Sequence, residues 1–374
     1  MAPLAGIRVL DFTRLIPGSF ATLMLAELGA EVIKIEDRTH GDPTRHLPPS
    51  LDGLGLYHLL LNRGKKSVAV ALRDPEALKR CDALIDSADV VIESFRPSTA
   101  RAIGISAEQL RARRPRLIHC AITGYGQTGP NAERPGHDLN YVAEGGLLAV
   151  DRPGLTDLPR MFIADVGGGA MSAVAGMLAA LFHRERTGEG ASLDISMHDA
   201  VLYWMMLPAA RDLIAGGDRA SGELPTFGRH ATYNVYETAD GQRVALGALE
   251  PKFWQAFCDL VGHPEWKARQ DSDEADQGAL VDEVRKLFLT RSRGAWLELF
   301  SGQAACLSAV NSPAEALADP HVAARRLLVE ADAIRAIRAP FVAEPATLCP
   351  APALGADNAD FGFSPPIPQS PIAR

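Results

Sequence analysis

A histidine and an aspartate in the middle of the chain could share proton-transfer chemistry. His137 follows a proline-glycine turn and precedes a half-buried segment of alternating polarity, so its ring is expected at the junction of a turn and the next element. Asp165 is an acid that could stand across from it. An imidazole and a carboxylate on opposite sides of a polarised carbonyl would suit proton transfer at the neighbouring carbon. The simpler interpretation, which these two residues alone favour, is a satisfied core histidine and an ordinary helix cap.

The residues after Asp165 could hold an oxygen that gains negative charge. Gly167, Gly168 and Gly169 follow it, and an apolar pattern over 171–182 then predicts a buried helix. Aspartate directly before a helix is a natural N-cap, because it accepts hydrogen bonds from free amides at the positive helix end. Glycines let a ligand approach the backbone, so their amides could form an oxyanion site.

Composition sets the class of protein. The 374 residues are 47% hydrophobic and 22% charged, which is typical of a globular protein with enough length for two domains. A formal charge of −8 argues against nucleic acid as the main partner. The five cysteines lack metal-binding or disulfide-framework spacing, so no metal site is expected. We see no secretory signal, and the apolar runs are broken before spanning length, so we expect a cytoplasmic protein without a membrane partner.

The first half alternates between strand and helix patterns. Strand patterns over 6–11 and 31–36 flank a helix pattern over 19–29, which is a βαβ unit and makes the strands parallel. The alternation continues, with strands expected over 67–72, 89–93 and 116–123. This predicts a Rossmann-like, doubly wound parallel sheet with its ligand at the carboxyl ends of the strands.

The turn after the first strand argues against a dinucleotide. Residues 13–18 read Thr-Arg-Leu-Ile-Pro-Gly and lack the G-x-G-x-x-G pattern that brings pyrophosphate to a helix. Cationic residues near the strand ends could instead clamp the phosphates of a nucleotide-like ligand, or they could be solvated surface charges. They are Lys34, Arg38, Arg63, Lys65, Lys66, Arg73, Arg96 and Arg101.

Several segments in fixed order resemble the family III CoA-transferases over nearly the whole chain. They are Asp11–Arg14, Leu28–Glu36, Gly41-Asp42 with Arg45, Asn62–Ser67 and Thr123–Pro130. The resemblance implies a CoA thioester as substrate, no permanently bound cofactor, and an interlocked, ring-shaped homodimer. It also implies CoA contacts in the large domain, from Ile16, Lys34, Arg38, Val70, Leu72, Arg73, Arg96, Arg101, Gly124, Tyr125 and Tyr141.

Three later motifs resemble the α-methylacyl-CoA racemases within that family. They are Gly136-His-Asp-Leu-Asn-Tyr141, Asp165-Val-Gly-Gly-Gly169 and Gly247-Ala-Leu-Glu-Pro251. The resemblance implies that His137 and Asp165 exchange the α-proton, that Glu250 partners His137, and that Asp138 stands beside the histidine. The implied reaction inverts C2 of a 2-methylacyl-CoA through an enolate whose oxygen is held near Gly167, Gly168 and Gly169.

Other functions remain open at this stage. In the CoA-transferases of the family the equivalent of Asp165 is a nucleophile that forms covalent intermediates, so Asp165 fits either reaction. A CoA-binding protein without catalysis is a second alternative. A Ser-His-Asp hydrolase is disfavoured because the sequence lacks a Gly-x-Ser-x-Gly elbow.

The second half of the sequence predicts a smaller domain. We expect a large CoA-binding domain over 1–215, a linker over 216–225 rich in glycine, and a small α+β domain over 226–320. Strand patterns over 233–237 and 243–248 open the small domain, and Glu250 stands where the second strand gives way to a helix. The proline-rich segment 321–374 is expected to return to the large domain.

Overall fold

The computed structural model describes residues 2–150, 161–214, 228–331, 334–342 and 349–367. The chain divides into two compact units, one of residues 1–213 with 325–374 and one of residues 214–324. The sequence had suggested divisions at 215 and 321. The expected linker over 216–225 lies outside the described residues.

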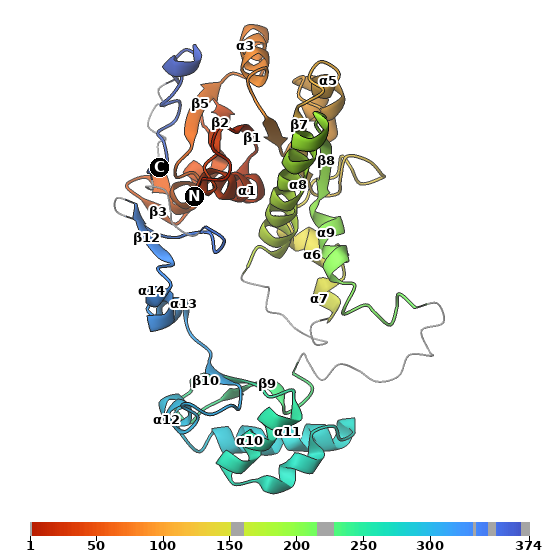
Figure 1. The fold of residues 1–374 in the computed structure, drawn as a ribbon, viewed down its shortest axis with the longest axis vertical. Helices are drawn as coiled ribbons and strands as arrows, with labels where there is room; N and C mark the ends of the chain where they lie inside the picture. The colour runs from red at the N-terminus through yellow and green to blue at the C-terminus, as the bar shows by residue number, and fades with distance from the viewer. Residues whose placement is uncertain (1, 151–160, 215–227, 332–333, 343–348, 368–374) are drawn as a thin grey trace. The chain divides into compact units, whose positions relative to one another are not determined.

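A six-stranded parallel sheet forms the centre of the first unit, as predicted (Figure 1). The strand order β5-β2-β1-β6-β7-β8 places the first strand in the middle, with the chain winding outward to either side. The carboxyl ends of β1 and β6 therefore meet at the point where the winding direction changes, which is where open α/β sheets bind ligands. The strands are β1 (Arg8–Phe12), β2 (Glu31–Asp37), β5 (Lys66–Val70), β6 (Val90–Glu93), β7 (Ile118–Thr123) and β8 (Ser192–Ser196).

Helices cover both faces of this sheet because alternate strand residues are apolar on each side. One face packs against α1 (Leu15–Glu27) and α8 (Ser172–Thr187), with Met24, Leu25 and Met177 among its buried side chains. The other face packs against α3 (Pro75–Ile85), α4 (Pro97–Ala102) and α5 (Ala107–Arg111). The prediction of a doubly wound sheet is therefore confirmed.

The C-terminal segment covers the free edge of β5. The Asn358 side chain accepts the Ala69 N–H at 2.7 Å and donates to the Ala69 carbonyl at 3.1 Å, so it imitates a neighbouring strand. Asp357 accepts the Ser67 N–H at 2.8 Å in the same way. An uncovered edge would expose these backbone groups to other chains. The last part of the expected return segment thus packs on the first unit.

Shorter elements complete the first unit. Between β2 and β5 lie η1 (Pro43–Arg45), β3 (Ser50–Leu51), β4 (Leu54–Gly55) and α2 (Leu56–Leu61). After β7 come α6 (Asp138–Glu144), α7 (Leu147–Val150), the π-helical segment η2 (Ile163–Met171) and, after β8, α9 (Met197–Trp204). The C-terminal part adds β12 (Leu328–Ala331), β13 (Ile334–Ile337) and η5 (Ala359–Phe361).

The second unit is an α+β domain with its own core. An antiparallel sheet of β9 (Tyr233–Glu237), β10 (Arg243–Gly247) and β11 (Leu307–Ala309) packs on helices through buried aromatic residues, among them Trp254, Phe257 and Trp296. The helices are α10 (Pro251–Val261), η4 (Pro264–Arg269), α11 (Glu274–Phe288), α12 (Arg293–Leu299), α13 (Pro313–Leu317) and α14 (Pro320–Ala324).

The helix expected over 171–182 is longer than the sequence suggested. The segment η2 runs directly into α8, which gives one 25-residue helical stretch, Ile163–Thr187, and an 18-residue window within it has a mean hydropathy of 1.4. By length and composition alone this stretch could cross a membrane, so the expectation that every apolar run stops short of spanning length was too strict. Half of its apolar window is buried inside the protein, as in a core helix.

Candidate active site

Two neighbouring hollows open at the carboxyl ends of the central strands. One, of about 450 Å³, lies over the ends of β1, β6 and β7 and reaches α6 and η2. The other, of about 920 Å³, lies over the ends of β2, β1, β5 and β6. We call them the β7 hollow and the β2 hollow. Both lie at the change of winding direction, where the fold predicts a ligand.

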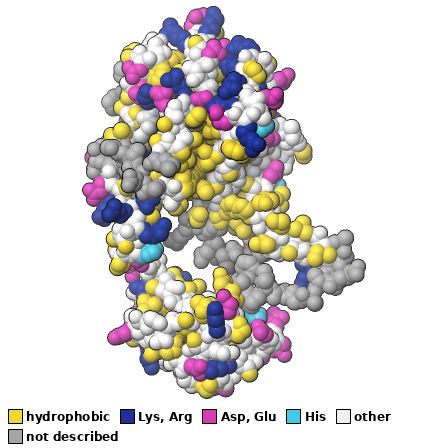
Figure 2. All heavy atoms as spheres, viewed as in Figure 1, with side chains coloured by type: hydrophobic (Ala, Val, Ile, Leu, Met, Phe, Trp, Pro, Cys, Tyr) yellow, Lys and Arg dark blue, Asp and Glu magenta, His cyan; other side chains and the backbone are white. Residues whose placement is uncertain are grey.

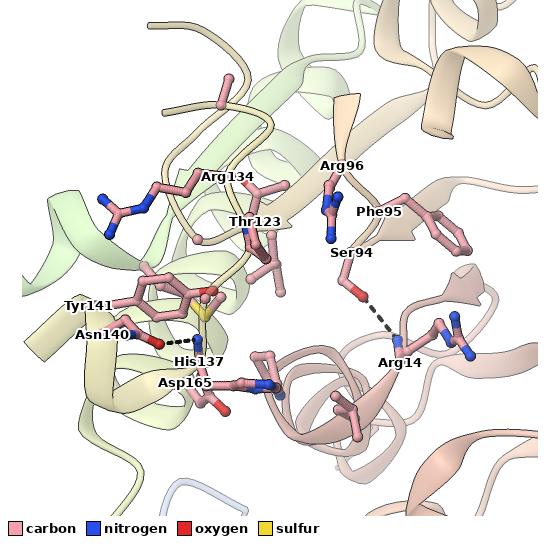
Figure 3. A pocket seen from close by; sticks show the side chains of 18 residues that line it. Arg14, Ser94, Phe95, Arg96, Thr123, Arg134, His137, Asn140, Tyr141 and Asp165 are labelled. Atoms are coloured by element: carbon pink, nitrogen blue, oxygen red, sulfur yellow. Dashed lines mark hydrogen bonds between the residues drawn. The ribbon is translucent and has the colours of Figure 1, made fainter. Parts of the chain in front are cut away.

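The β7 hollow holds the proposed acid and base. Figure 3 shows His137, Asn140 and Tyr141 on one side of it and Arg14, Ser94 and Phe95 on the other. Asp165 also lines this hollow. The chain therefore brings together the imidazole and the carboxylate that the sequence singled out.

His137 is the residue directly before α6, at the junction of turn and helix that the sequence predicted. Its backbone N–H donates to Oδ1 of Asn140 at 3.0 Å, which fixes the start of the helix. The residue is exposed, so the interpretation as a satisfied core histidine is wrong. His137 lines the β7 hollow, where a bound substrate could contact it.

Asp165 lies inside the helical segment η2, and the prediction that it caps a helix starting near Met171 is wrong. Its backbone N–H donates to Oδ1 of Asp138 at 2.8 Å, so Asp138 performs the capping from α6. This hydrogen bond joins the start of α6 to the first turn of η2. It also places two carboxyl groups close to each other.

The surroundings of Asp165 favour its neutral form. Burial raises the pKa of Asp165 to about 7, and the negative charge of Asp138 adds to the shift. Like charges and a low dielectric both disfavour the ionised carboxylate. Asp165 can therefore hold or release a proton near neutral pH.

Tyr141 lines the β7 hollow between β7 and α6. Its buried ring lies so close to Gly124 and Gly136 that a Cβ at these positions would come within 2.5 and 2.7 Å of the ring, respectively. Both positions therefore require glycine. Burial raises the pKa of Tyr141, and Asp165 adds to the shift, so the hydroxyl stays protonated. The ring also makes an edge contact with Tyr125 at 5.3 Å between centroids.

The three glycines after Asp165 serve helix packing. A Cβ at Gly167 would come within 2.1 Å of the Trp204 ring, and Gly168 and Gly169 are buried against α9. All three lie within η2, and they are not among the residues that line the β7 hollow. The expected open glycine turn with free amides is therefore wrong, because these residues let two helices approach closely.

Lys34 is not among the residues that line either hollow, so its role as a CoA contact stays a prediction. Its side chain is 1% exposed, and its Nζ lies 3.1 Å from Asp42 and 3.7 Å from Asp11. Burial by itself would lower the pKa of Lys34, because it disfavours the charged form. The charges of Asp11 and Asp42 outweigh this effect, and the pKa of Lys34 is raised. Lys34 also donates to the Thr13 carbonyl at 3.0 Å, so it holds the turn after β1 from below.

That turn has an unusual backbone. Leu15 adopts a φ of 64°, which is rare for a residue with a side chain. Its N–H donates to Oδ2 of Asp42 at 3.2 Å, and Asp42 is in turn paired with Lys34. The buried ion pair thus stabilises the strained turn that carries Arg14 and Leu15 into both hollows.

The remaining predicted CoA contacts divide into two groups. Leu72 and Arg73 line the β2 hollow, Gly124 and Tyr141 line the β7 hollow, and Arg96 lines both. The others are not among the lining residues of either hollow. They are Ile16, Arg38, Val70, Arg101 and Tyr125.

Several of the cations that could have clamped phosphates have partners within the chain. Arg38 donates to the Pro365 carbonyl, and Arg101 lies 3.5 Å from Glu133. Arg63 pairs with Glu27, and Lys66 with Glu31 at 2.6 Å. Lys65 is buried beside Asp11 at 3.5 Å. Each of these five cations therefore has a partner within the chain, buried for Arg63 and Lys65 and more exposed for Lys66 and Arg101.

Sequence reasoning missed several residues of the hollows. Arg14, Ser94 and Phe95 line both, while Thr123, Arg134 and Asn140 line the β7 hollow. Arg14 and Ser94 stand in the turns that follow β1 and β6. The strand order would have pointed to these two turns, because ligands bind where the winding direction changes.

Glu250 belongs to the second unit, so its pairing with His137 stays a prediction. It directly precedes α10, where the sequence expected a strand-to-helix junction. Pro251 follows at the first helical position, where its missing N–H costs nothing. In the described part of the chain, no group of three or more His, Cys, Asp or Glu residues is arranged to hold a metal ion.

The fold and the position of the hollows define a Rossmann-like α/β protein with a ligand site at the switch point of its sheet. The model of the CoA-transferase family III matches residues 4–358, and the chain belongs to this family, as its motifs predicted.

Its relatives include both transferases and racemases. It is 34% identical to the probable fatty acyl-CoA transferase Rv3272 of Mycobacterium tuberculosis, over 90% of this chain and 91% of that protein. The crystal structure of Rv3272 superimposes with a TM-score of 0.84, covering 96% and 99% of the two chains at 31% identity. The human succinyl-CoA:glutarate CoA-transferase is 31% identical over 88% of this chain and 76% of its own. The mouse α-methylacyl-CoA racemase is 29% identical over 85% of this chain and 80% of its own.

Proposed function

We propose that the protein is an acyl-CoA racemase that inverts C2 of a 2-methylacyl-CoA. One base removes the α-proton of the thioester, an enolate forms, and a group on the opposite face returns a proton to the same carbon. The single observation that carries the proposal is that His137 and Asp165 line one hollow at the carboxyl end of the sheet. Two separate acid-base groups are what a proton exchange between two faces requires.

The protonation behaviour of Asp165 supports this reaction. A racemase must use each group as a base for one enantiomer and as an acid for the other. A general acid-base group is most effective when its pKa lies near the working pH, and the pKa of Asp165 is raised to about 7. An aspartate with its ordinary pKa would be a poor proton donor at neutral pH.

Other donors must stabilise the enolate oxygen, because the three glycines of η2 are engaged in helix packing. Asn140 lines the same hollow, and its Oδ1 accepts the His137 N–H. Its amide Nδ2 is therefore a candidate donor on the histidine side. Preorganised donors of this kind lower the energy of an oxyanion in a site that excludes water.

The test is deuterium exchange at C2 of a chiral 2-methylacyl-CoA in D2O. The proposal expects deuterium incorporation together with loss of optical purity, and both should be lost in His137→Ala and Asp165→Ala. Ser98→Ala, a change on the exposed surface, serves as the matched control and should exchange at the normal rate. Absence of exchange with short, long and branched substrates would contradict the proposal.

A CoA-transferase is the second candidate, favoured by the relatives that carry this activity in their names. Asp165 would then attack the thioester carbonyl, expel the CoA thiolate and form a mixed anhydride, which CoA attacks in turn to give an aspartyl thioester and release the acid. Hydroxylamine would trap the acylated aspartate and change its mass. Acyl transfer to a second carboxylic acid without exchange at C2 would establish this function.

We also propose that the chain works as a homodimer. Large apolar side chains are exposed on α8 and α9, and Figure 2 shows hydrophobic side chains gathered on this part of the surface. They include Phe182 of α8 and Leu202, Tyr203 and Trp204 of α9, and the exposed Leu207 follows shortly after α9. Exposed apolar patches of this kind mark interaction surfaces. Light scattering should give twice the mass of one chain, and Phe182→Glu should lower it.

A further inference from the structure

Two turns separate the β7 hollow from the β2 hollow. Five residues line both, namely Arg14, Leu15, Ser94, Phe95 and Arg96. We call them the partition. The Arg14 N–H donates to Oγ of Ser94 at 2.9 Å, so the turn after β1 is tied to the turn after β6. A ligand that extends from one hollow into the other must pass this partition.

A buried acid that the proposed chemistry does not use binds the backbone of the partition. Glu93 is the last residue of β6, and it is 0% exposed. Its Oε2 accepts the Phe95 N–H at 2.6 Å, which closes the turn that carries Ser94 and Arg96. Because β6 lies between β1 and β7, solvent does not reach this carboxyl group.

Among the residues that the structure describes, no cation balances a negative charge on Glu93. The Nε2 of His119 in β7 lies 4.0 Å from its Oε1, but this nitrogen donates to the Ile105 carbonyl at 3.1 Å. Burial lowers the pKa of His119 to about 4, and nearby Arg111 adds to the shift, so the ring is neutral and forms no ion pair. The other ionisable groups facing Glu93 are Asp194 of β8 and the Cys120 thiol.

These surroundings keep the acid neutral. Burial raises the pKa of Glu93 to about 8, and the charge of Asp194 adds to the shift. The Oε1 atom is buried, and it has no hydrogen-bond partner among the described residues. Ionisation would therefore leave an unpaired charge inside the sheet.

We propose that Glu93 is a positioning residue whose neutral carboxyl group holds the partition, and Arg96 with it, in the geometry that binds the CoA thioester. Ionisation at alkaline pH strengthens the bond to the Phe95 N–H but places a charge without a counter-ion inside the sheet, so the carboxylate moves toward solvent, shifts the Ser94–Arg96 turn and weakens binding. The inference rests on the proposed function only in taking CoA thioesters as the ligands of the two hollows. It holds equally for a racemase and for a transferase.

The test measures affinity for S-ethyl-CoA, a thioether that neither reacts nor carries an ionisable thiol. With the wild-type protein, we expect the dissociation constant to rise about tenfold from about pH 7 to about pH 9.5, as the buried acid ionises. Glu93→Gln keeps the oxygen that accepts the Phe95 N–H but cannot ionise. Its affinity should stay within about threefold of wild type at neutral pH and should not fall at alkaline pH.

Two further variants complete the design. Glu93→Ala removes the acceptor and should weaken binding about tenfold at every pH, with a larger effect on KM than on kcat. Glu133 accepts hydrogen bonds from Ser98 at the start of α4 but is exposed, so Glu133→Gln should keep the wild-type pH dependence. If Glu93→Ala does not fold, the pH dependence of affinity in wild type and Glu93→Gln still decides whether ionisation of Glu93 weakens binding.

The outcomes separate the two proposals. The same alkaline loss of affinity in wild type and Glu93→Gln would overturn the role of Glu93, as would a wild-type affinity that does not change with pH. Failure of the wild-type protein to bind S-ethyl-CoA at any pH would overturn the assignment of the hollows to acyl-CoA, and this inference with it. Binding without exchange at C2 would contradict the racemase alone and leave the role of Glu93 intact.

Discussion

Two groups of acids lie near the same edge of the sheet, and they differ in the charge of their neighbours. Below the turn after β1, each acid faces a cation: Asp11 and Asp42 face Lys34, and Glu36 binds Arg45 at 2.7 Å. At the meeting of α6 and η2, Asp165 instead faces a second acid, Asp138.

The consequences for protonation are opposite as well. Burial alone would raise the pKa of Glu36, but the hydrogen bonds and charge of Arg45 lower it to about 2. Lysines in the same way hold the pKa values of Asp11 and Asp42 below their ordinary value, against the effect of burial. For Asp165, burial and the neighbouring charge act in the same direction.

The difference separates acids that hold the fold from an acid that is available for chemistry. A buried carboxylate with a cation beside it stays ionised over the physiological range and acts as a fixed part of the structure. A carboxyl group without a cation, next to a second acid and in a hollow, changes its charge near neutral pH. Altering one member of each group tests this distinction.

The largest effect is expected for Asp165→Asn. This variant keeps the shape of the side chain but removes its acid-base function, and the rate of deuterium exchange at C2 should fall about a thousandfold or more. Glu36→Gln changes a carboxylate of the ion-paired group in the same way, and any of its protein that remains folded should keep exchange within about tenfold of wild type. Similar losses of exchange per folded molecule in both variants would contradict the distinction.

The second effect concerns stability. Lys34→Met leaves Asp11 and Asp42 without their shared cation, and it should lower the free energy of unfolding by about 3 to 5 kcal/mol. Lys66→Met is the matched control, because Lys66 pairs with Glu31 on the surface and should cost less than about 1 kcal/mol. Urea unfolding at neutral pH measures both. Equal losses would show that the buried lysine is not essential to the turn.

The comparison also explains which parts of the molecule could be predicted from the sequence. The parallel sheet follows from local patterns of strand and helix, and His137 was placed correctly at its turn because a proline-glycine pair marks turns by itself. The buried pairing of Lys34 was not predicted, because its position near a strand end shows a cation, while its partner Asp42 comes from a later loop. A pairing between separate segments leaves no local signal.

The glycines after Asp165 show the same limit. Three glycines in succession suggest an open turn, but their role is set by Trp204 and Met197 of α9, which pack on them. Likewise, the proximity of Asp138 to Asp165 depends on how α6 meets η2. The identity of the acid was therefore predictable, whereas its raised pKa was not, because burial and the second carboxylate arise only from the folded chain.

The third effect is the dependence of stability on pH. The pKa of Asp165 is about 7 in the folded protein, against an ordinary value of 3.8, so the folded state binds this proton more tightly than the unfolded state. Below about pH 4 both states are protonated and the group contributes nothing; above about pH 7 it is an anion whose burial destabilises the fold. Asp165→Asn should therefore be more stable than wild type by about 2 kcal/mol at pH 8, allowing for partial exposure, and no more stable near pH 4. A gain of the same size at both pH values would exclude ionisation as its cause.

The smallest effect should come from Asp138→Asn. The asparagine Oδ1 can still accept the Asp165 N–H, so the junction of α6 and η2 should hold, but the charge beside Asp165 is lost. The pKa of Asp165 should then fall, and the corresponding limb in the pH profile of kcat/KM for exchange should move to lower pH. The limb should not return to the ordinary value for an aspartate, since burial is the larger cause of the raised pKa. Asp199→Asn, at an exposed acid in the first turn of α9, should leave the profile in place. A limb that stays unmoved in Asp138→Asn would mean that burial alone raises the pKa of Asp165. Asp138 would then serve only to join α6 to η2.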